Sequence, residues 1–469
     1  MTSADTVDTP AIDVSAFKAY DVRGVIGETI DAGFVARVAR AAADVLGAKS
    51  AAVGFDARET SEEFARAAIS GLRSAGCDAT ELGLCGTEEV YFEAGSQSLD
   101  LGIMITASHN PIEYNGIKVV GPSARPLTDQ EFSAIRRRTS RGDPLRDSLP
   151  GRRRPVSPIR RAAYARHLAS LVDAQAIGPL KIVFNCGNGA AGPTLKAVLG
   201  ELERLGGGIE PTIVYGDPDA AFPNGIPNPL LPENHAATAE AVAAAGADFG
   251  VAFDGDFDRC FLFDERGEFV AGEYVVALLA AATLARHPHA PIVHDPRVTW
   301  AITTRIDAAG GAAVASQTGH AFIKGTMRAA SAPYGGEMSA HHYFRDFFYC
   351  DSGMIPWMMI AELVSRGGRP LGDLVREMRC NHPSSGEINF PVSDKAGAMR
   401  DVEERLLGGA LTVSRLDGLS AEFADWRVNL RASNTENLLR LNVEARGSRE
   451  LLAEKTAELS ALLKSWSDA

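Results

Sequence analysis

The sequence has few cysteines, no long apolar run and no excess of positive charge. Its six cysteines are scattered over 469 residues, and no two of them stand in a CxxC spacing. This pattern predicts a reduced, cytoplasmic protein. No stretch approaches the roughly 18 apolar residues of a membrane-spanning helix, so we expect no membrane partner. The net charge of −13 argues against a nucleic-acid partner, but a local basic pocket can still bind an anionic small molecule.

The first residues lack the features of a targeting segment. Residues 1–15 are polar and acidic, with neither the basic start nor the apolar centre of a secretory signal. We predict that they form a disordered lead-in.

The chain is too long for one hydrophobic core, because cores stop growing at roughly 250–300 residues. Strand-like apolar runs, such as 101–106 and 180–184, alternate with Ala-rich helical patterns, which indicates α/β units with mainly parallel strands. Composition changes at 141–158, near 266 and after 366–370. We therefore predict three α/β domains and a smaller C-terminal α+β domain, over residues 16–157, 158–265, 266–371 and 372–469.

The first candidate loop follows the run at 101–106 and carries Ser108 in the segment Thr-Ala-Ser-His-Asn-Pro. A serine at a strand end is accessible to covalent modification, although the segment lacks the GxSxG elbow of a hydrolase. An ordinary Ser/Asn/Pro turn is the open alternative. The adjacent His109 is no sign of a catalytic pair, because neighbours on a loop commonly point apart.

The second loop places Asp254, Asp256 and Asp258 directly after a strand-like run. Their mutual repulsion would raise their pKa values unless a cation bound them, and oxygen ligands suit Mg²⁺. A calcium-binding EF-hand is disfavoured, because its sixth position needs glycine and the sequence has Arg259. A solvated acidic turn remains an alternative.

The third loop, residues 335–342, reads Gly-Gly-Glu-Met-Ser-Ala-His-His. Glycines allow close backbone approach, and the polar side chains offer donors and acceptors for sugar hydroxyls. The histidine and cysteine spacing fits no closed zinc site. A structural turn is the alternative.

The fourth loop, residues 431–437, carries Arg431 and hydroxyl side chains between two strand-like runs. A guanidinium with loop amides forms an anion site, since it contacts phosphate oxygens in bidentate fashion. A polar hairpin loop is the alternative. Isolated basic residues elsewhere are equally compatible with structural roles; the candidates among them are Lys18, Arg23, His320 and Lys324.

Together, these four loops resemble those of the α-D-phosphohexomutases, in the same order along nearly the whole chain. Residues 106–111 look like the family's phosphoserine loop, and residues 254–259 look like its metal loop. Residues 336–341 look like its sugar-recognition loop, and residues 431–435 like its phosphate loop. The resemblance implies three similar mixed-sheet α/β domains plus a smaller C-terminal α+β domain around a central cleft.

Within the family, residues 226–233 and 334–344 resemble the bacterial phosphomannomutases of GDP-mannose and exopolysaccharide synthesis. Met338 disfavours the phosphoglucosamine branch, which usually has Gln there. Phe257 stands where many relatives have Gly, but it lies between ligand positions, so we expect no loss of metal binding. Residues 295–300 lack the Lys-bearing pattern of some relatives, so no residue is assigned there.

The resemblance implies a role for each matching residue. Ser108 carries the phosphoryl group and binds Mg²⁺ together with Asp254, Asp256 and Asp258, and a hexose 1,6-bisphosphate is the intermediate and activator. Arg259, Lys118 and His320 support transfer and proton handling. The expected contacts to the hexose phosphate are Lys18, Arg23, His109, Lys324, Gly336, Glu337, Ser339, His341, Arg431, Ser433, Asn434, Thr435 and Arg440.

The activity predicted in this way is that of a phosphomannomutase, an isomerase acting on small hexose phosphates. A phosphoglucomutase or dual enzyme is the nearest alternative, because mannose and glucose differ only at C2. A phosphatase would release free phosphate instead, and a non-catalytic sugar-phosphate binder would show no turnover. Whether the protein is a monomer or a dimer stays open.

Overall fold

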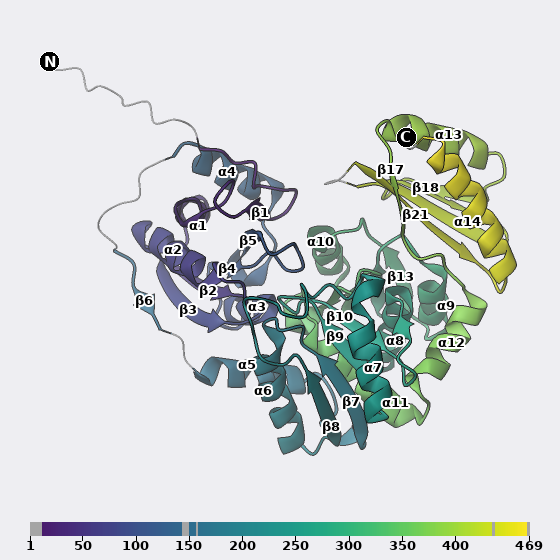
Figure 1. The fold of residues 1–469 in the computed structure, drawn as a ribbon, viewed down its shortest axis with the longest axis horizontal. Helices are drawn as coiled ribbons and strands as arrows, with labels where there is room; N and C mark the ends of the chain where they lie inside the picture. Colours follow the sequence, from purple (N-terminus) through teal and green to yellow (C-terminus); the bar gives the residue numbers. More distant parts are fainter. Residues whose placement is uncertain (1–11, 143–149, 156–157, 434–436, 467–469) are drawn as a thin grey trace.

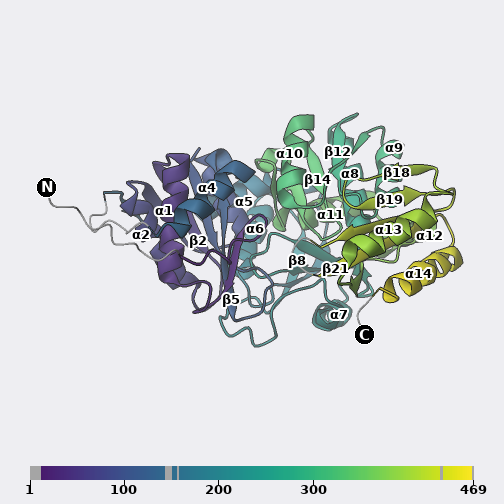
Figure 2. The same ribbon diagram turned by 90° about the horizontal axis from the view of Figure 1, so that it is seen from above.

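The computed structural model describes residues 12–142, 150–155, 158–433 and 437–466. They form four domains, each built on its own sheet, with domains I and IV at opposite ends in both views (Figures 1 and 2). The predicted fold class, three mixed-sheet α/β domains plus a smaller C-terminal domain, is confirmed. Within the described residues, none of the helices is both long and apolar enough to span a bilayer.

Domain I has a six-stranded sheet in the order β1-β5-β4-β2-β3-β6, in which β1 and β5 run antiparallel to their neighbours. Its strands are β1 (Val22–Val25), β2 (Ser50–Phe55), β3 (Asp78–Leu84), β4 (Leu101–Ile105), β5 (Tyr114–Val120) and β6 (Arg153–Arg154). Its helices are α1 (Ala32–Leu46), α2 (Ser61–Ser74), α3 (Thr87–Ser96) and α4 (Asp129–Ser140).

Domain II has a five-stranded sheet in the order β11-β10-β9-β7-β8. Its strands are β7 (Leu180–Asn185), β8 (Ile209–Val214), β9 (Phe249–Phe253), β10 (Cys260–Phe263) and β11 (Phe269–Val270). Its helices are α5 (Pro158–Ala169), α6 (Ala191–Arg204) and α7 (Ala236–Ala245).

Domain III repeats this plan with the strand order β13-β12-β14-β15-β16. Its strands are β12 (Pro291–His294), β13 (Ala312–Ala315), β14 (Tyr334–Gly336), β15 (His342–Phe344) and β16 (Cys350–Asp351). Its helices are α8 (Gly272–Arg286), α9 (Trp300–Ala308), α10 (His320–Ala330), α11 (Met354–Gly367) and α12 (Leu371–Asn381).

Domain IV is an antiparallel sheet in the order β17-β21-β20-β19-β18, covered by two helices. Its elements are β17 (Ile388–Pro391), α13 (Lys395–Leu406), β18 (Thr412–Ser414), β19 (Leu419–Glu422), β20 (Trp426–Ala432), β21 (Leu438–Ala445) and α14 (Arg449–Lys464). Its apolar core is separate, whereas one continuous core runs through domains II and III and includes part of domain I.

The described structure shifts three of the expected boundaries. Residues 12–15 belong to domain I, because the Ile12 amide donates to the Ser140 carbonyl at 3.0 Å and Ile12 packs on the domain's core. Strand β11 completes the second sheet beyond residue 265. Helix α12 packs on α8 and α9, so domain III continues past residue 371.

The first three sheets place their candidate loops at the same topological point. In each domain a strand that pairs in parallel on one side is joined by the loop to an antiparallel neighbour: β4 to β5, β9 to β10 and β14 to β15. Strands β4 and β9 are buried along their whole length, which explains their continuous apolar sequences. The loops therefore begin at the carboxyl ends of these strands, where function gathers in such sheets.

Candidate active site

Ser108 is held on a strained loop at the end of β4. Its backbone is left-handed, with φ of 50°, and its amide donates to the Thr106 hydroxyl at 2.8 Å. The buried guanidinium of Arg58 donates to four carbonyls of the loop, including that of Ser108 at 2.9 Å and that of Tyr114 at 3.0 Å. A non-glycine residue with positive φ costs of order 1–3 kcal/mol, and the guanidinium bonds help to hold it.

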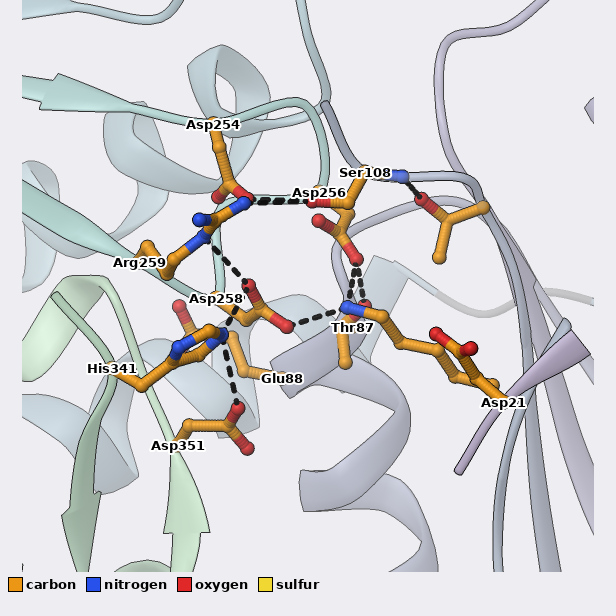
Figure 3. A network of polar contacts seen from close by, with 12 residues as sticks. Asp21, Thr87, Glu88, Ser108, Asp254, Asp256, Asp258, Arg259, His341 and Asp351 are labelled. Carbon is orange, nitrogen blue, oxygen red and sulfur yellow. Dashed lines mark hydrogen bonds and ion pairs between the residues drawn. The ribbon is translucent and has the colours of Figure 1, made fainter. Parts of the chain in front are cut away.

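The metal loop between β9 and β10 lies directly against the serine loop. A Cβ atom on Gly255 would be 2.6 Å from the Ser108 carbonyl oxygen, so only glycine fits there. The side chains of Asp254, Asp256 and Asp258 are all buried and converge with Ser108 (Figure 3). The Ser108 hydroxyl donates to Asp254 Oδ2 at 2.7 Å.

Each of these aspartates has one oxygen held by the protein and one without a partner. Arg259 Nε donates to Asp254 Oδ2 at 2.9 Å, and Lys118 Nζ donates to Oδ2 of both Asp256 and Asp258 at 2.6 Å. The three Oδ1 atoms are buried and have no hydrogen-bond partner among the described residues. Such orphaned acceptors are costly unless a ligand satisfies them.

The donor set fits a hard divalent cation. One carboxylate oxygen from each of the three aspartates lies within 4.8 Å of the other two. Burial raises the pKa of the Asp254 carboxyl to about 6; Asp258 and Asp256 add to the shift, while Arg259 opposes it. A cation among these oxygens would supply the missing positive charge, and all-oxygen ligands are what Mg²⁺ prefers.

His109 and Arg259 also face the serine. The His109 Nδ1 atom is 3.0 Å from Ser108 Oγ and makes a close contact with the Arg259 guanidinium, whose Nη2 donates to Ser108 Oγ at 3.2 Å. Burial, with the charges of Arg259 and Arg23, lowers the pKa of His109 well below its usual value. The imidazole is therefore neutral, and its unprotonated ring nitrogen can accept a hydrogen bond here.

In the candidate sugar-recognition loop, residues 336–341, the Glu337 side chain holds the loop in place. Glu337 is buried, and its carboxylate accepts from the Gly319 amide at 2.9 Å and the Tyr343 hydroxyl at 2.5 Å. Burial raises the pKa of this carboxyl, although the positive charge of Arg297 opposes the shift. Ser339 Oγ accepts from Arg297 at 3.3 Å. Gly336 has a packing role, because a Cβ there would lie 2.6 Å from the Tyr334 hydroxyl.

A cavity of about 140 Å³ lies between domains I and III, and several of the predicted site residues line it. Lys324 in its wall is buried, with Nζ 2.6 Å from Asp351 Oδ1, and burial together with Lys324 lowers the pKa of His320 to about 4. The polar residues lining the cavity include Tyr20, Arg23, Lys118, Asp258, His320, Lys324, His341 and Asp351.

Lys18 is a predicted contact that the structure places outside this cavity. Its side chain is exposed, and its Nζ donates to the Ser15 carbonyl at 3.0 Å. Arg23, by contrast, lines the cavity and contacts the Asn110 side chain of the serine loop. Only one of the two basic residues near the start of the chain therefore faces the site.

The fourth loop contributes to a cluster of guanidinium groups around Glu387. The Glu387 carboxylate lies 3.0 Å from Arg431, 3.3 Å from Arg440 and 3.5 Å from Arg297. Burial lowers the pKa of Arg431, and the positive charge of Arg297 adds to the shift, while Glu387 opposes it. Such a cluster suits a phosphate group.

The remaining residues of this loop differ in what the structure describes. Ser433 is buried, and its amide donates to the Leu438 carbonyl at 2.9 Å. Asn434 and Thr435, predicted as phosphate contacts, lie outside the described residues.

Sequence reasoning missed Arg58, Arg297 and Glu387. It assigned no residue in 295–300, yet Arg297 bonds Asp295 at 2.7 Å and reaches both the sugar-recognition loop and the guanidinium cluster. Arg58 and Arg297 each stand shortly after a strand of a parallel pair, β2 or β12. This position after a parallel strand was the sequence signal that could have identified them as site residues.

The chain matches the four domain models of one family, described as phosphoglucomutase/phosphomannomutase. Its alpha/beta/alpha domains I, II and III match residues 14–146, 162–267 and 271–380, and its C-terminal domain matches residues 387–462.

Curated relatives match over nearly their whole length. The chain is 50% identical to a phosphomannomutase of Salmonella typhimurium and 48% identical to one of Escherichia coli, covering 96% of this chain and 99% of each relative. It is also 48% identical to a protein of Xanthomonas campestris named phosphohexose mutases, with the same coverage.

A solved structure of a phosphoglucomutase/phosphomannomutase family protein from Burkholderia thailandensis superposes with a TM-score of 0.86. It is 30% identical, and the match covers 97% of this chain and 98% of that one. An N-acetylphosphoglucosamine mutase of Aspergillus fumigatus, solved with glucose 1,6-bisphosphate, shares the fold with a TM-score of 0.60 at 14% identity; the match covers 97% of this chain and 96% of that one.

Proposed function

We infer the activity from one premise: the chain belongs to the phosphoglucomutase/phosphomannomutase family. It is a mutase, an isomerase that moves a phosphoryl group within a hexose phosphate. Its main reaction is the interconversion of mannose 6-phosphate and mannose 1-phosphate. The observation that carries the assignment is the Ser108 hydroxyl, which lies 2.7 Å from Asp254 Oδ2 beside three orphaned carboxylate oxygens.

The cation of this site is Mg²⁺. Asp254, Asp256 and Asp258 would hold it, together with an oxygen of the phosphorylated Ser108. When bound, it supplies Lewis-acid neutralisation of the charge on the transferring group. The three buried oxygens without a hydrogen-bond partner among the described residues support this assignment, because they are hard ligands and the two cationic side chains beside them, Lys118 and Arg259, bond the other oxygens of the three carboxylates.

In the resting enzyme Ser108 is phosphorylated, and hexose 1-phosphate places its phosphate against Arg431, with Arg297 and Arg440 alongside. The 6-hydroxyl attacks the phosphorus, so that a new P–O bond forms as the P–Oγ bond to Ser108 breaks. His320 is the candidate acceptor of the hydroxyl proton, because its pKa of about 4 leaves the imidazole unprotonated at neutral pH. Transfer of this kind depends chiefly on positioning and neutralisation of charge.

The resulting hexose 1,6-bisphosphate turns over in the cleft and returns its 1-phosphate to Ser108. The site therefore binds the sugar in two opposite orientations. Glu337, Ser339 and His341 contact ring hydroxyls in both, because they lie between the metal loop and the guanidinium cluster. His341 Nε2 is 3.7 Å from Asp258 Oδ1, and Ser339 Oγ bonds Arg297.

A dual specificity for mannose and glucose phosphates is the second candidate, favoured by the relative named phosphohexose mutases. The test compares kcat/KM for mannose 1-phosphate and glucose 1-phosphate, each with its matching 1,6-bisphosphate. A preference for mannose of tenfold or more supports the main assignment, and equal values support the dual one. Release of free phosphate as the main product would replace both with a phosphatase.

The cellular role follows from the product. Mannose 1-phosphate is the substrate of a nucleotidyl transfer that forms GDP-mannose, so we place the enzyme in the cytoplasm, supplying surface polysaccharide synthesis. The scattered, unpaired cysteines support that location. Removing the protein from cells and measuring the GDP-mannose pool tests this role, and an unchanged pool would contradict it.

A further inference from the structure

The first turn of α3 in domain I reaches into the metal loop of domain II. The Thr87 hydroxyl donates to Asp256 Oδ2 at 2.5 Å, and the Thr87 amide donates to the Asp256 carbonyl at 3.2 Å. Thr87 is fully buried, so water cannot replace these bonds. Figure 3 shows Thr87 beside Asp256, on the side away from Asp254.

These bonds decide which oxygen of Asp256 is left for a cation. Oδ2 accepts from both Thr87 and Lys118, while Oδ1 is buried and accepts no hydrogen bond within the part of the chain that the structure describes. Lys118 Nζ also donates to Asp258 Oδ2, at the same distance of 2.6 Å. The ammonium group by itself therefore does not select one orientation of the Asp256 carboxylate. Among the described residues the Thr87 hydroxyl donates to Asp256 Oδ2 and to no second acceptor, so this bond favours one orientation of the carboxylate.

Neighbouring elements from all three large domains hold Thr87 in place. A Cβ on Gly86 would lie 2.2 Å from the ring of Phe257, a buried metal-loop residue whose φ is 46°. Glu88 accepts from the Ser352 hydroxyl and from the Met354 amide, at 3.2 Å, at the start of α11. The first turn of α3 therefore lies between the metal loop and domain III. Phe257 serves as a packing residue against this turn.

We propose that Thr87 is a positioning residue for the cation: it fixes Asp256 across the boundary between domains I and II, and so ties cation affinity to the packing of the domains. The proposal rests on the proposed function, because it takes the three aspartates as the cation ligands. Residues that orient metal ligands typically change metal affinity 10- to 100-fold when they are removed.

The test is direct Mn²⁺ titration of the metal-free full chain, with free Mn²⁺ followed by electron paramagnetic resonance. Thr87→Val keeps the shape and removes the hydroxyl, and we expect a 10- to 100-fold higher Kd for Mn²⁺. Thr87→Ser keeps the hydroxyl and should bind within about threefold of the parent chain. If Thr87→Val does not fold, Thr87→Ala provides the same comparison with a smaller side chain.

Thr194→Val is the matched control. Thr194 is also buried, and its hydroxyl donates at 2.8 Å to Glu89, which lies in the same helical turn as Thr87, rather than to an aspartate of the metal loop. It should leave the Kd for Mn²⁺ within twofold. An equal loss in both valine variants, or none in Thr87→Val, would overturn the proposal. A parent chain that binds no Mn²⁺ would overturn the cation site itself, and with it this inference.

Discussion

The surroundings of Ser108 and those of Arg431 are held together by different forces. Around Ser108, the loops of domains I and II pack so closely that Gly255 admits no side chain, and the reacting groups are buried. Around Arg431, the guanidinium groups of Arg431 and Arg440 from domain IV and of Arg297 from domain III gather on the Glu387 carboxylate, and domain IV has its own core. Close packing and buried ion pairs together hold the first region, whereas ion pairs to Glu387 hold the second.

The contacts that join domain IV to domain III are polar in the same way. Glu444 accepts from the amides of Thr299 and Trp300 at the start of α9, and Arg427 donates to the Arg297 carbonyl at 2.9 Å. These hydrogen bonds from domain IV therefore hold the loop that carries Arg297 in place. If the proposed function holds, the groups for phosphoryl transfer lie in domains I to III, whereas those for phosphate recognition are charges on domains III and IV.

The largest effect is expected at the centre of the packed region. Ser108→Ala removes the phosphoryl carrier, so kcat should fall at least about a thousandfold, or about 4 kcal/mol of barrier. The unfolding temperature should stay close to that of the parent chain. Steady-state kinetics with bisphosphate present measures the loss, and retention of more than about a tenth of the rate would contradict the assigned carrier.

The next largest effect concerns the cation. Excess chelator should abolish turnover, and Asp256→Asn should raise the Mg²⁺ concentration for half-maximal rate about 10-fold or more, because it removes a ligand charge. Asp217→Asn, whose side chain is 95% exposed, is the control and should change nothing. Undiminished turnover in excess chelator would refute the metal assignment.

In the charge-held region, we expect binding to weaken more than chemistry. Arg431→Met keeps the apolar stem and removes the guanidinium, so KM for hexose 1-phosphate should rise about 10- to 100-fold, as for loss of a charge-assisted hydrogen bond worth about 1.5–3 kcal/mol. Arg415→Met, at an exposed arginine paired with Glu403, serves as the control. An unchanged KM would remove Arg431 from the phosphate site.

The smallest expected effect is on phosphate binding, and it tests most directly whether charge holds the guanidinium cluster together. Glu387 occupies the guanidinium cluster as a counter-charge that phosphate must compete with, so Glu387→Gln should bind inorganic phosphate about threefold to tenfold more tightly, or ~1 kcal/mol. Isothermal titration measures this, with Glu377→Gln in a remote exposed pair as the control. Weaker binding would mean that Glu387 chiefly orients the arginines.

Much of the fold and of the site could be predicted from local sequence. The runs that became β4, β7 and β9 were recognisable because buried strands are mostly apolar, whereas β20 and β21 showed alternating apolar and polar residues. Three of the four candidate loops follow β4, β9 or β20. Ser108 and the three aspartates indeed converge. Lys18 carried the same kind of local signal as Arg23, yet only Arg23 faces the cavity.

The site residues that were not predicted from the sequence share a property that local sequence does not show. Arg58, Thr87, Arg297 and Glu387 act through partners far away in the chain, such as Asp256 for Thr87. At the start of a helix, Thr87 gives no local sign beyond a helix terminus. Domain boundaries were also displaced, because α12 takes its place from packing on α8 and α9.

The sequence by itself determined the four loops, their residue types and their order, because strands, turns and ligand chemistry are written in short segments. Only the tertiary structure decided which oxygen of each aspartate is held and which is free, and which arginines share Glu387. Those outcomes depend on distances between side chains from separate domains, and such distances arise only when the domains pack.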